Sequence, residues 1–144
     1  MAETKAFSDA FEAEVLNHAF GLAGDTFTRT GLYLALVTSS VGEAETGATM
    51  SELPVSNGYA RQAIAFGTAT TSGTGYQIAN ITSDTVFTAS GGAWSTVVGV
   101  AIMDVVTDGA GNILAFDNSI SSATLADGDT LTFAVGNVVV SIDI

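Results

Sequence analysis

The spacing of apolar residues changes once along the chain, close to residue 30. Before that point large side chains recur at intervals of three and four residues, which predicts an amphipathic helix over residues 7–22. Ser8 is a suitable N-cap, and Gly21 and Gly24 provide the signal that ends the helix. One face of the helix would carry a stripe formed by Phe7, Phe11, Val15, His18, Ala19 and Leu22.

After residue 30 the period becomes two, and Val, Thr, Ile and aromatic residues predominate, which is typical of β-strands. The clearest alternation lies in 129–135 and 137–143, and Gly136-Asn137 between them predicts a tight hairpin. The predicted strands are 31–38, 59–66, 76–81, 84–88, 96–105, 112–117, 129–135 and 137–143.

About eight short strands separated by Gly-rich turns indicate an all-β fold, a jelly-roll-like β-sandwich with one short N-terminal amphipathic helix. Residues 1–144 would form a single domain. Within it we expect an N-terminal helical arm over 1–30 and the β-sandwich over 31–144.

The stretch from Thr38 to Asn57 shows no period of either kind. It contains Glu43, Glu45 and Glu52, and a loop of this length without its own structure is unusual in a small domain. Two interpretations stay open. The segment is either a mobile surface loop or a loop that a partner orders.

Composition excludes several classes of function. The chain has 15 acidic residues against Lys5, Arg29 and Arg61, a formal net charge of −12, which excludes binding to nucleic acid phosphates and to anionic membranes. There is no cysteine, so disulfides and thiolate metal sites are absent. The longest apolar run, 97–103, is far shorter than the roughly 20 residues of a membrane-spanning helix. We therefore expect a protein made in the cytoplasm without a targeting segment.

Residues with catalytic or ligand-binding chemistry are few. His18 is the only histidine and lies on the apolar helix face, so neither a catalytic triad nor a histidine metal site is expected. Asp104 and Asp117 are the acids inside strand patterns, the candidates for paired-carboxylate catalysis. Residues 104–112 share some features of a calcium loop without its ligand register. We expect no enzyme activity, no cofactor and no resident metal. Three aromatic residues are candidates either for a sugar-binding platform or for core packing, namely Trp94, Tyr59 and Tyr76.

Several segments, in a fixed order along nearly the whole chain, resemble a family of small structural proteins of tailed bacteriophages. Members of this family are labelled head decoration (cement), tail-fibre or minor tail proteins. The chain departs from the family pattern by a long insertion at 41–53 and by the path of 102–106. The matching segments are 14–21, 32–38, 58–62, 86–89, Trp94 with the strand that ends at Asp104, 112–115, 127–136 and 138–143.

The resemblance implies a non-enzymatic virion protein. We expect a capsid decoration or cement protein, a homotrimer that binds the outer surface of the major capsid protein shell and stabilises it. The alternative is a tail-fibre or minor tail module that contacts host surface glycans through Trp94 or Tyr76. An enzyme that uses Asp104 or Asp117 is the third possibility.

The partner interface is expected to combine the helix stripe with the acidic loop. The stripe would either cap the sandwich or contact neighbouring subunits. Acidic residues concentrate in the first 52 positions, and their repulsion from packaged DNA favours the outside of the shell. The expected contact residues are Phe7, Phe11, Val15, His18, Leu22, Glu43, Glu45 and Glu52.

Overall fold

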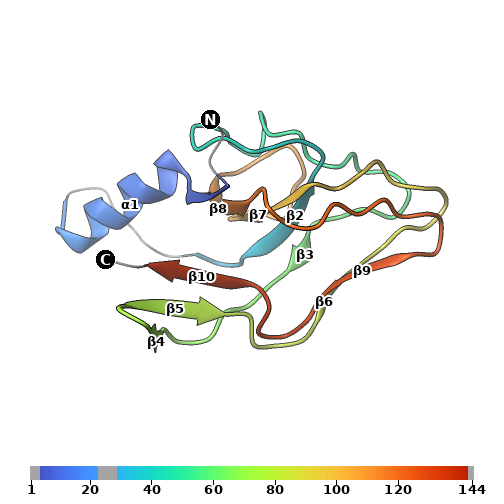
Figure 1. The fold of residues 1–144 in the computed structure, drawn as a ribbon. Helices are drawn as coiled ribbons and strands as arrows, with labels where there is room; N and C mark the ends of the chain where they lie inside the picture. Colours follow the sequence, from blue (N-terminus) through green and yellow to red (C-terminus); the bar gives the residue numbers. More distant parts are fainter. Residues whose placement is uncertain (1–3, 23–28, 143–144) are drawn as a thin grey trace.

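The computed structural model describes residues 4–22 and 29–142, which form mostly β-structure with one short helix, α1 (Asp9–Ala19) (Figure 1). This confirms the predicted all-β fold class. Within the described residues, no helix has the length and apolar character needed to cross a membrane. The strands are β1 (Lys5–Phe7), β2 (Tyr33–Val37), β3 (Gln62–Ala63), β4 (Thr70–Ser72), β5 (Gly75–Ala79), β6 (Thr85–Thr88), β7 (Gly99–Met103), β8 (Ile113–Asp117), β9 (Thr130–Phe133) and β10 (Val139–Ile142).

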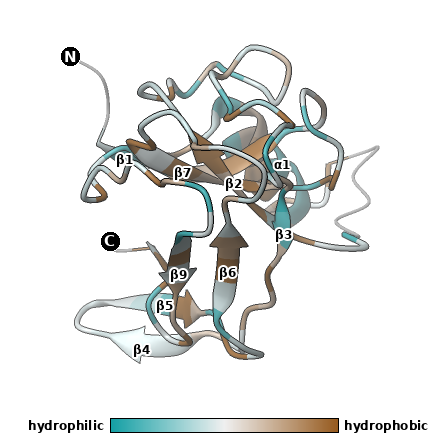
Figure 2. Ribbon diagram, turned by 90° about the vertical axis from the view of Figure 1, so that its right-hand side faces the viewer, coloured by the Kyte–Doolittle hydropathy of each residue, from teal (hydrophilic) through white to brown (hydrophobic). Residues whose placement is uncertain are grey.

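The large sheet has the strand order β1-β8-β7-β2-β3, and all neighbouring strands are antiparallel. Its central strands β2 and β7 are buried on both faces, so they are apolar at nearly every position, and both are mostly brown in Figure 2. Leu34 and Leu36 belong to one apolar cluster, whereas Ala35 and Val37 belong to another. The large sheet therefore separates two cores.

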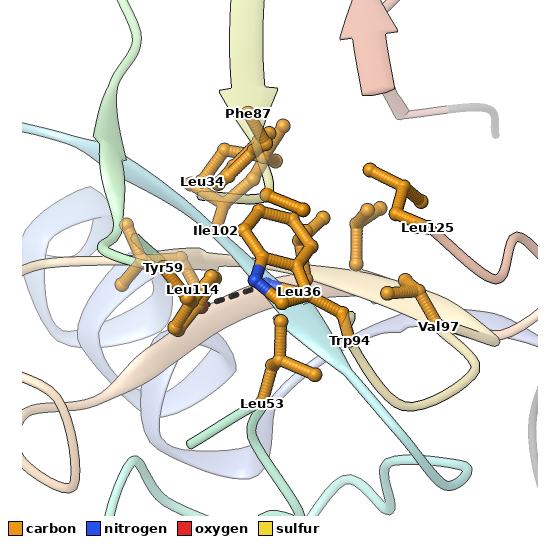
Figure 3. Close-up of a cluster of buried hydrophobic side chains, with 12 residues drawn as sticks. Leu34, Leu36, Leu53, Tyr59, Phe87, Trp94, Val97, Ile102, Leu114 and Leu125 are labelled. Atoms are coloured by element: carbon orange, nitrogen blue, oxygen red, sulfur yellow. Dashed lines mark hydrogen bonds between the residues drawn. The ribbon is translucent and has the colours of Figure 1, made fainter. Parts of the chain in front are cut away.

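The larger core contains the only tryptophan, Trp94, packed edge-on against Tyr59 with ring centroids 5.8 Å apart (Figure 3). Trp94 Nε1 donates to the carbonyl oxygen of Asn57 at 2.8 Å. The Tyr59 hydroxyl accepts a hydrogen bond from the Leu36 amide at 3.1 Å. Both rings are buried and their polar atoms are paired, so core packing is the correct interpretation for Trp94 and Tyr59, and the sugar-platform interpretation is wrong.

Two smaller sheets, β10-β5-β4 and β6-β9, complete the described fold. The predicted strands 129–135 and 137–143 exist in shortened form, but the predicted hairpin between them is wrong. Instead β9 pairs with β6, and β10 pairs with β5. Figure 1 shows the sheet of β10, β5 and β4 at the same end of the molecule as α1.

The side chain of Asn80 explains why β9 and β10 separate. Asn80 is buried, its Nδ2 donates to the Ala134 carbonyl at 3.2 Å, and its Oδ1 accepts from the Val138 amide at 3.0 Å. Gly136 lies at φ +84° and donates its amide to the Asn80 carbonyl at 2.9 Å. The turn predicted at this point is therefore present, but its backbone groups bond to Asn80 and the chain continues into another sheet.

The predicted strand 59–66 is mostly irregular, because this segment crosses between sheets. Tyr59 closes a turn with its amide bonded to the Ser56 carbonyl, and only Gln62–Ala63 pairs with β2. Phe66 then forms an isolated bridge with Asn80 on the far side. The sequence did not predict β4, whose polar residues Thr70–Ser72 pair with β5 through a short turn.

The helix is shorter than predicted. Ser8 is its N-cap, as predicted, with Oγ accepting from the Phe11 amide at 3.2 Å. Phe7 belongs to strand β1, and the helix ends at Ala19 ahead of Gly21, which lies at φ +62°. The second predicted stop residue, Gly24, lies outside the described residues.

The segment 38–57 is packed onto the protein by its own contacts, in contrast to the mobile loop that the sequence allowed. The Thr38 amide bonds to the Ser51 carbonyl at 2.8 Å, and the Leu53 amide bonds to the Leu36 carbonyl at 2.9 Å. Val41 and Met50 are buried in the second core. The segment thus covers the outer face of the large sheet, and its irregular apolar spacing reflects a loop packed over a sheet.

Candidate functional site

An apolar hollow of about 150 Å³ lies between α1 and the sheet of β4, β5 and β10. The helix contributes Phe11 and Val15, and β10 contributes Val140 and Ile142 from the opposite side. Tyr76 on β5 pairs with Ile142 in register and is 60% exposed. The helix therefore covers the sheet incompletely and leaves apolar side chains accessible at this end of the molecule.

The predicted helix stripe divides into an inner and an outer part. Phe7, Phe11 and Val15 are half-buried, and the rings of Phe7 and Phe11 meet edge-on at 5.1 Å. His18 and Leu22 are exposed near the end of the helix. One part of the stripe thus packs on the protein, and the other part faces outward, where contact with a neighbouring subunit stays a prediction.

Arg29 fixes the helix to the large sheet. Its guanidinium forms ion pairs with Glu14 on the helix and, at 3.4 Å, with Asp104 after β7. The same group lies 5.8 Å from the centroid of the Phe11 ring, within the range of a cation–π interaction. At its N-terminus α1 is joined to β8, because the Ser8 hydroxyl donates to the Ile113 carbonyl. The helix is therefore held at several points along its length.

The three predicted acidic contacts lie in different environments. Glu43 is exposed, and its carbonyl accepts the Asp9 amide at 3.0 Å. Glu45 is half-buried, and its carboxylate accepts from the Gly42 amide at 2.6 Å. The side chain of Glu52 is only 5% exposed, so it lies inside the protein and offers no surface to a partner. Of the three, Glu43 is the most accessible.

Glu52 belongs to a buried polar network that the sequence did not reveal. Arg61, with a fully buried side chain, donates from Nε and Nη2 to the two carboxylate oxygens of Glu52 at 2.9 and 2.6 Å. Its Nη1 donates to the carbonyls of Val105 and Ala110, both at 3.0 Å. The Tyr59 hydroxyl donates to Glu52 at 2.7 Å. The network joins segment 38–57, the start of β3 and the turn after β7.

A second acid, Asp108, adjoins this network. Burial, together with the neighbouring carboxylate of Glu52, raises the pKa of Asp108 to about 6. Burial opposes ionisation of Glu52 too, but hydrogen bonds from Arg61, Asp108 and Tyr59, together with the charge of Arg61, outweigh it and lower the pKa of Glu52. One guanidinium thus faces two carboxyl groups, and Asp108 is the one that holds its proton to higher pH. A lone Arg in an otherwise uncharged stretch was the only sequence signal for this arrangement.

The acids considered for catalysis do not lie together. The antiparallel pairing of β7 with β8 places Asp104 beside Asn112 at one end and Asp117 opposite Val100 at the other. Asp104 accepts from the Asn112 amide at 2.7 Å, and Asp117 forms an ion pair with Lys5 at 3.0 Å. Among residues 4–22 and 29–142, no group of three or more His, Asp or Glu could hold a metal ion. Each carboxylate has a structural partner.

The uncharged sheet, defined as β4, β5 and β10, is the other distinctive surface. Residues 62–83 and 130–142, which include these strands, contain no charged side chain at all, in a chain whose net charge is −12. A groove of about 350 Å³ runs beside β10, with Val138–Ser141 on one wall and β1 on the other. Val139 and Ile142 are 46% and 54% exposed. Strand β10 therefore presents apolar side chains to solvent on a surface without charge.

A scan of the chain against protein-family models matches residues 6–141 with the family described as podophage GP4 fiber I protein gp80. A comparison with curated proteins finds no match. The family match covers almost all of the chain, and it confirms the resemblance to structural proteins of tailed phages. The chain therefore belongs to the podophage GP4 fiber I protein gp80 family, whose members are structural proteins of the phage virion.

Proposed function

We propose that this protein is a subunit of a fibre on the virion of a tailed phage. The observation that carries the proposal is the family match over residues 6–141, because the description of the family names a fibre protein. The sequence alone favoured decoration of the capsid shell, with a tail fibre as the alternative. The family description supports the alternative.

The distribution of charge and apolar surface is consistent with a building block that docks by one end. The uncharged sheet and the hollow beneath α1 present accessible apolar side chains, whereas most acidic residues lie elsewhere. Burying uncharged surface avoids the large desolvation cost of burying ions. The acidic residues on the rest of the surface stay hydrated, and their like charge makes separate subunits repel one another elsewhere.

Partners and ligands stay predictions. Contact with the major capsid protein and a homotrimeric state were expected from the resemblance. Contact with host glycans would have to use Tyr76, since Trp94 lies in the core. The exposed residues of the predicted interface are His18, Leu22 and Glu43.

Location in the virion tests the proposal. The chain has no cysteine, so Thr107→Cys, at an exposed position away from the uncharged sheet, gives one site for a gold label. We expect label on fibres, and fewer copies per particle than the major capsid protein by quantitative mass spectrometry. Virions with the wild-type chain control for unspecific labelling. Label spread evenly over the shell, at a copy number near that of the capsid protein, would show decoration instead.

A further inference from the structure

Strand β10 lies at one edge of the uncharged sheet, and among the described residues it pairs with β5 alone, so its other edge is open. In the β10–β5 pair the Asn80 amide donates to the Val138 carbonyl at 3.1 Å, which fixes the hydrogen-bonding phase of the ladder. In an antiparallel ladder, successive residues direct their backbone N–H and C=O groups to opposite sides, so Val140 and Ile142, like Val138, bond toward β5. The N–H and C=O groups of Val139 and Ser141 consequently face away from β5, along the open edge.

This edge lacks the features that normally prevent strands from pairing with other chains. Residues 130–142 contain no proline, lysine or other charge. The opposite edge of the same sheet, β4, consists of Thr70–Ser72, which are all polar and exposed and appear almost white in Figure 2. Of the two edges, only β10 combines free backbone groups with apolar side chains, Val139 and Ile142.

We propose that β10 pairs antiparallel with β10 of a second copy of this chain, so that two uncharged sheets join into one. The charge distribution favours a second copy, because two chains of net charge −12 can approach closely only where each lacks acids. In this pairing Val139 and Ser141 exchange hydrogen bonds with the same residues of the other copy. The inference rests on the proposed fibre function, since it names the partner of a fibre subunit.

The surface beside β10 can accept such a partner. The groove of about 350 Å³ next to β10 is lined mainly by apolar residues, Ile102 and Phe133 among them. Its rim on the β1 side carries Lys5 and Asp117, which neutralise each other at 3.0 Å. A second copy would therefore add a strand to β10 without meeting an unpaired charge at this rim.

Proline substitution tests the pairing, because proline removes one N–H and leaves the chain otherwise similar. Ser141→Pro removes an outward N–H of β10. Thr71→Pro is the matched control, since Thr71 is exposed and pairs with Tyr76, and by the same alternation its N–H faces away from β5 on the β4 edge. The dissociation constant of each purified full-length variant is measured by sedimentation over a range of concentrations.

We expect a wild-type dimer, or larger species built from dimers, and a dissociation constant raised roughly tenfold to a hundredfold by Ser141→Pro, since one hydrogen bond is lost in each copy. Thr71→Pro should leave it unchanged. A monomer at all concentrations, or equal effects of both variants, would overturn the proposal. A trimer would overturn it too, since a twofold strand pair cannot close three copies.

Hydrogen exchange provides a readout that needs no variant. The amides of Val139 and Ser141 should exchange more slowly in concentrated than in dilute wild-type protein, whereas the Thr71 amide should not change. Equal rates at both concentrations would refute the pairing. A dimer through β10 found together with gold label on the shell would reject the fibre function and keep this inference. A monomer found together with gold label on fibres would keep the fibre function and reject this inference.

Discussion

Replacing Arg61 with methionine tests whether the buried polar network holds the large sheet and its covering loops together. The side chain of Arg61 is fully buried and donates four hydrogen bonds, two to Glu52 and two to backbone carbonyls. Methionine fills a similar volume but donates none of them. The carboxylate of Glu52 would then lie inside the protein without its counter-charge.

The expected loss of unfolding free energy follows from that geometry. Removing one partner of a buried ion pair costs about 3–5 kcal/mol, because the remaining ion stays desolvated. The double variant Arg61→Met/Glu52→Leu should regain most of this loss, since no charge of the pair then remains buried. Lys5→Met is the control, because Lys5 pairs with Asp117 while 67% exposed, and a surface pair contributes about 0–1 kcal/mol.

Urea denaturation at pH 7 measures these differences, and the single tryptophan makes the assay direct. Trp94 is 5% exposed within the core, so its fluorescence reports global unfolding. With a slope of about 2 kcal/mol per molar urea, the midpoint of Arg61→Met should fall by roughly 2 M. A midpoint shift no larger than that of Lys5→Met would show that the network contributes nothing beyond a surface ion pair.

Three further changes test other parts of the fold. The pKa of Asp108 rises to about 6 on folding from its usual 3.8, so the contribution of this proton to stability is complete below pH 4 and is lost as the pH rises through 6. Asp108→Asn should therefore have a higher urea midpoint than wild type at pH 8, and this advantage should be smaller at pH 4. Gly47→Ala would place Cβ 2.1 Å from the Ala110 carbonyl oxygen and should cost about 1–3 kcal/mol, whereas Gly42→Ala, whose nearest neighbour lies 3.9 Å away, should be neutral in thermal melts. Ser8→Ala removes the N-cap of α1 and should cost about 1–2 kcal/mol in the same urea assay; no loss would mean that the cap is dispensable.

Strand identity could be predicted from the sequence because it depends on local pattern. The segments 31–38, 96–105 and 112–117 contain β2, β7 and β8, since continuous apolar runs bounded by turns describe strands buried on both faces. Pairing could not be predicted in the same way. The alternation in 129–135 and 137–143 is compatible with a hairpin, whereas in the structure the distant side chain of Asn80 bonds to both segments and the two strands join different sheets.

The candidate site shows the same division between local and distant information. The helix stripe is a periodic feature, so the sequence could indicate Phe11 and Val15 as packing residues. Glu52 was grouped with Glu43 and Glu45 because all three lie in one aperiodic segment. Its burial depends on Arg61, nine residues further on, and on carbonyls of the turn after β7, which no local spacing encodes.

The structure shows how the three basic residues of this acidic chain are paired. Each of the three basic residues is already engaged with an acid, Lys5 with Asp117, Arg29 with Glu14 and Asp104, and Arg61 with Glu52. No base is therefore left over to bind phosphate or to form an ion pair with another copy. The proposed contact between two copies uses the uncharged sheet, and it forms against a residual repulsion between acidic surfaces that acts over about 10 Å at 0.1 M salt. Added salt should for this reason strengthen the contact, whereas it would weaken an interface built on ion pairs.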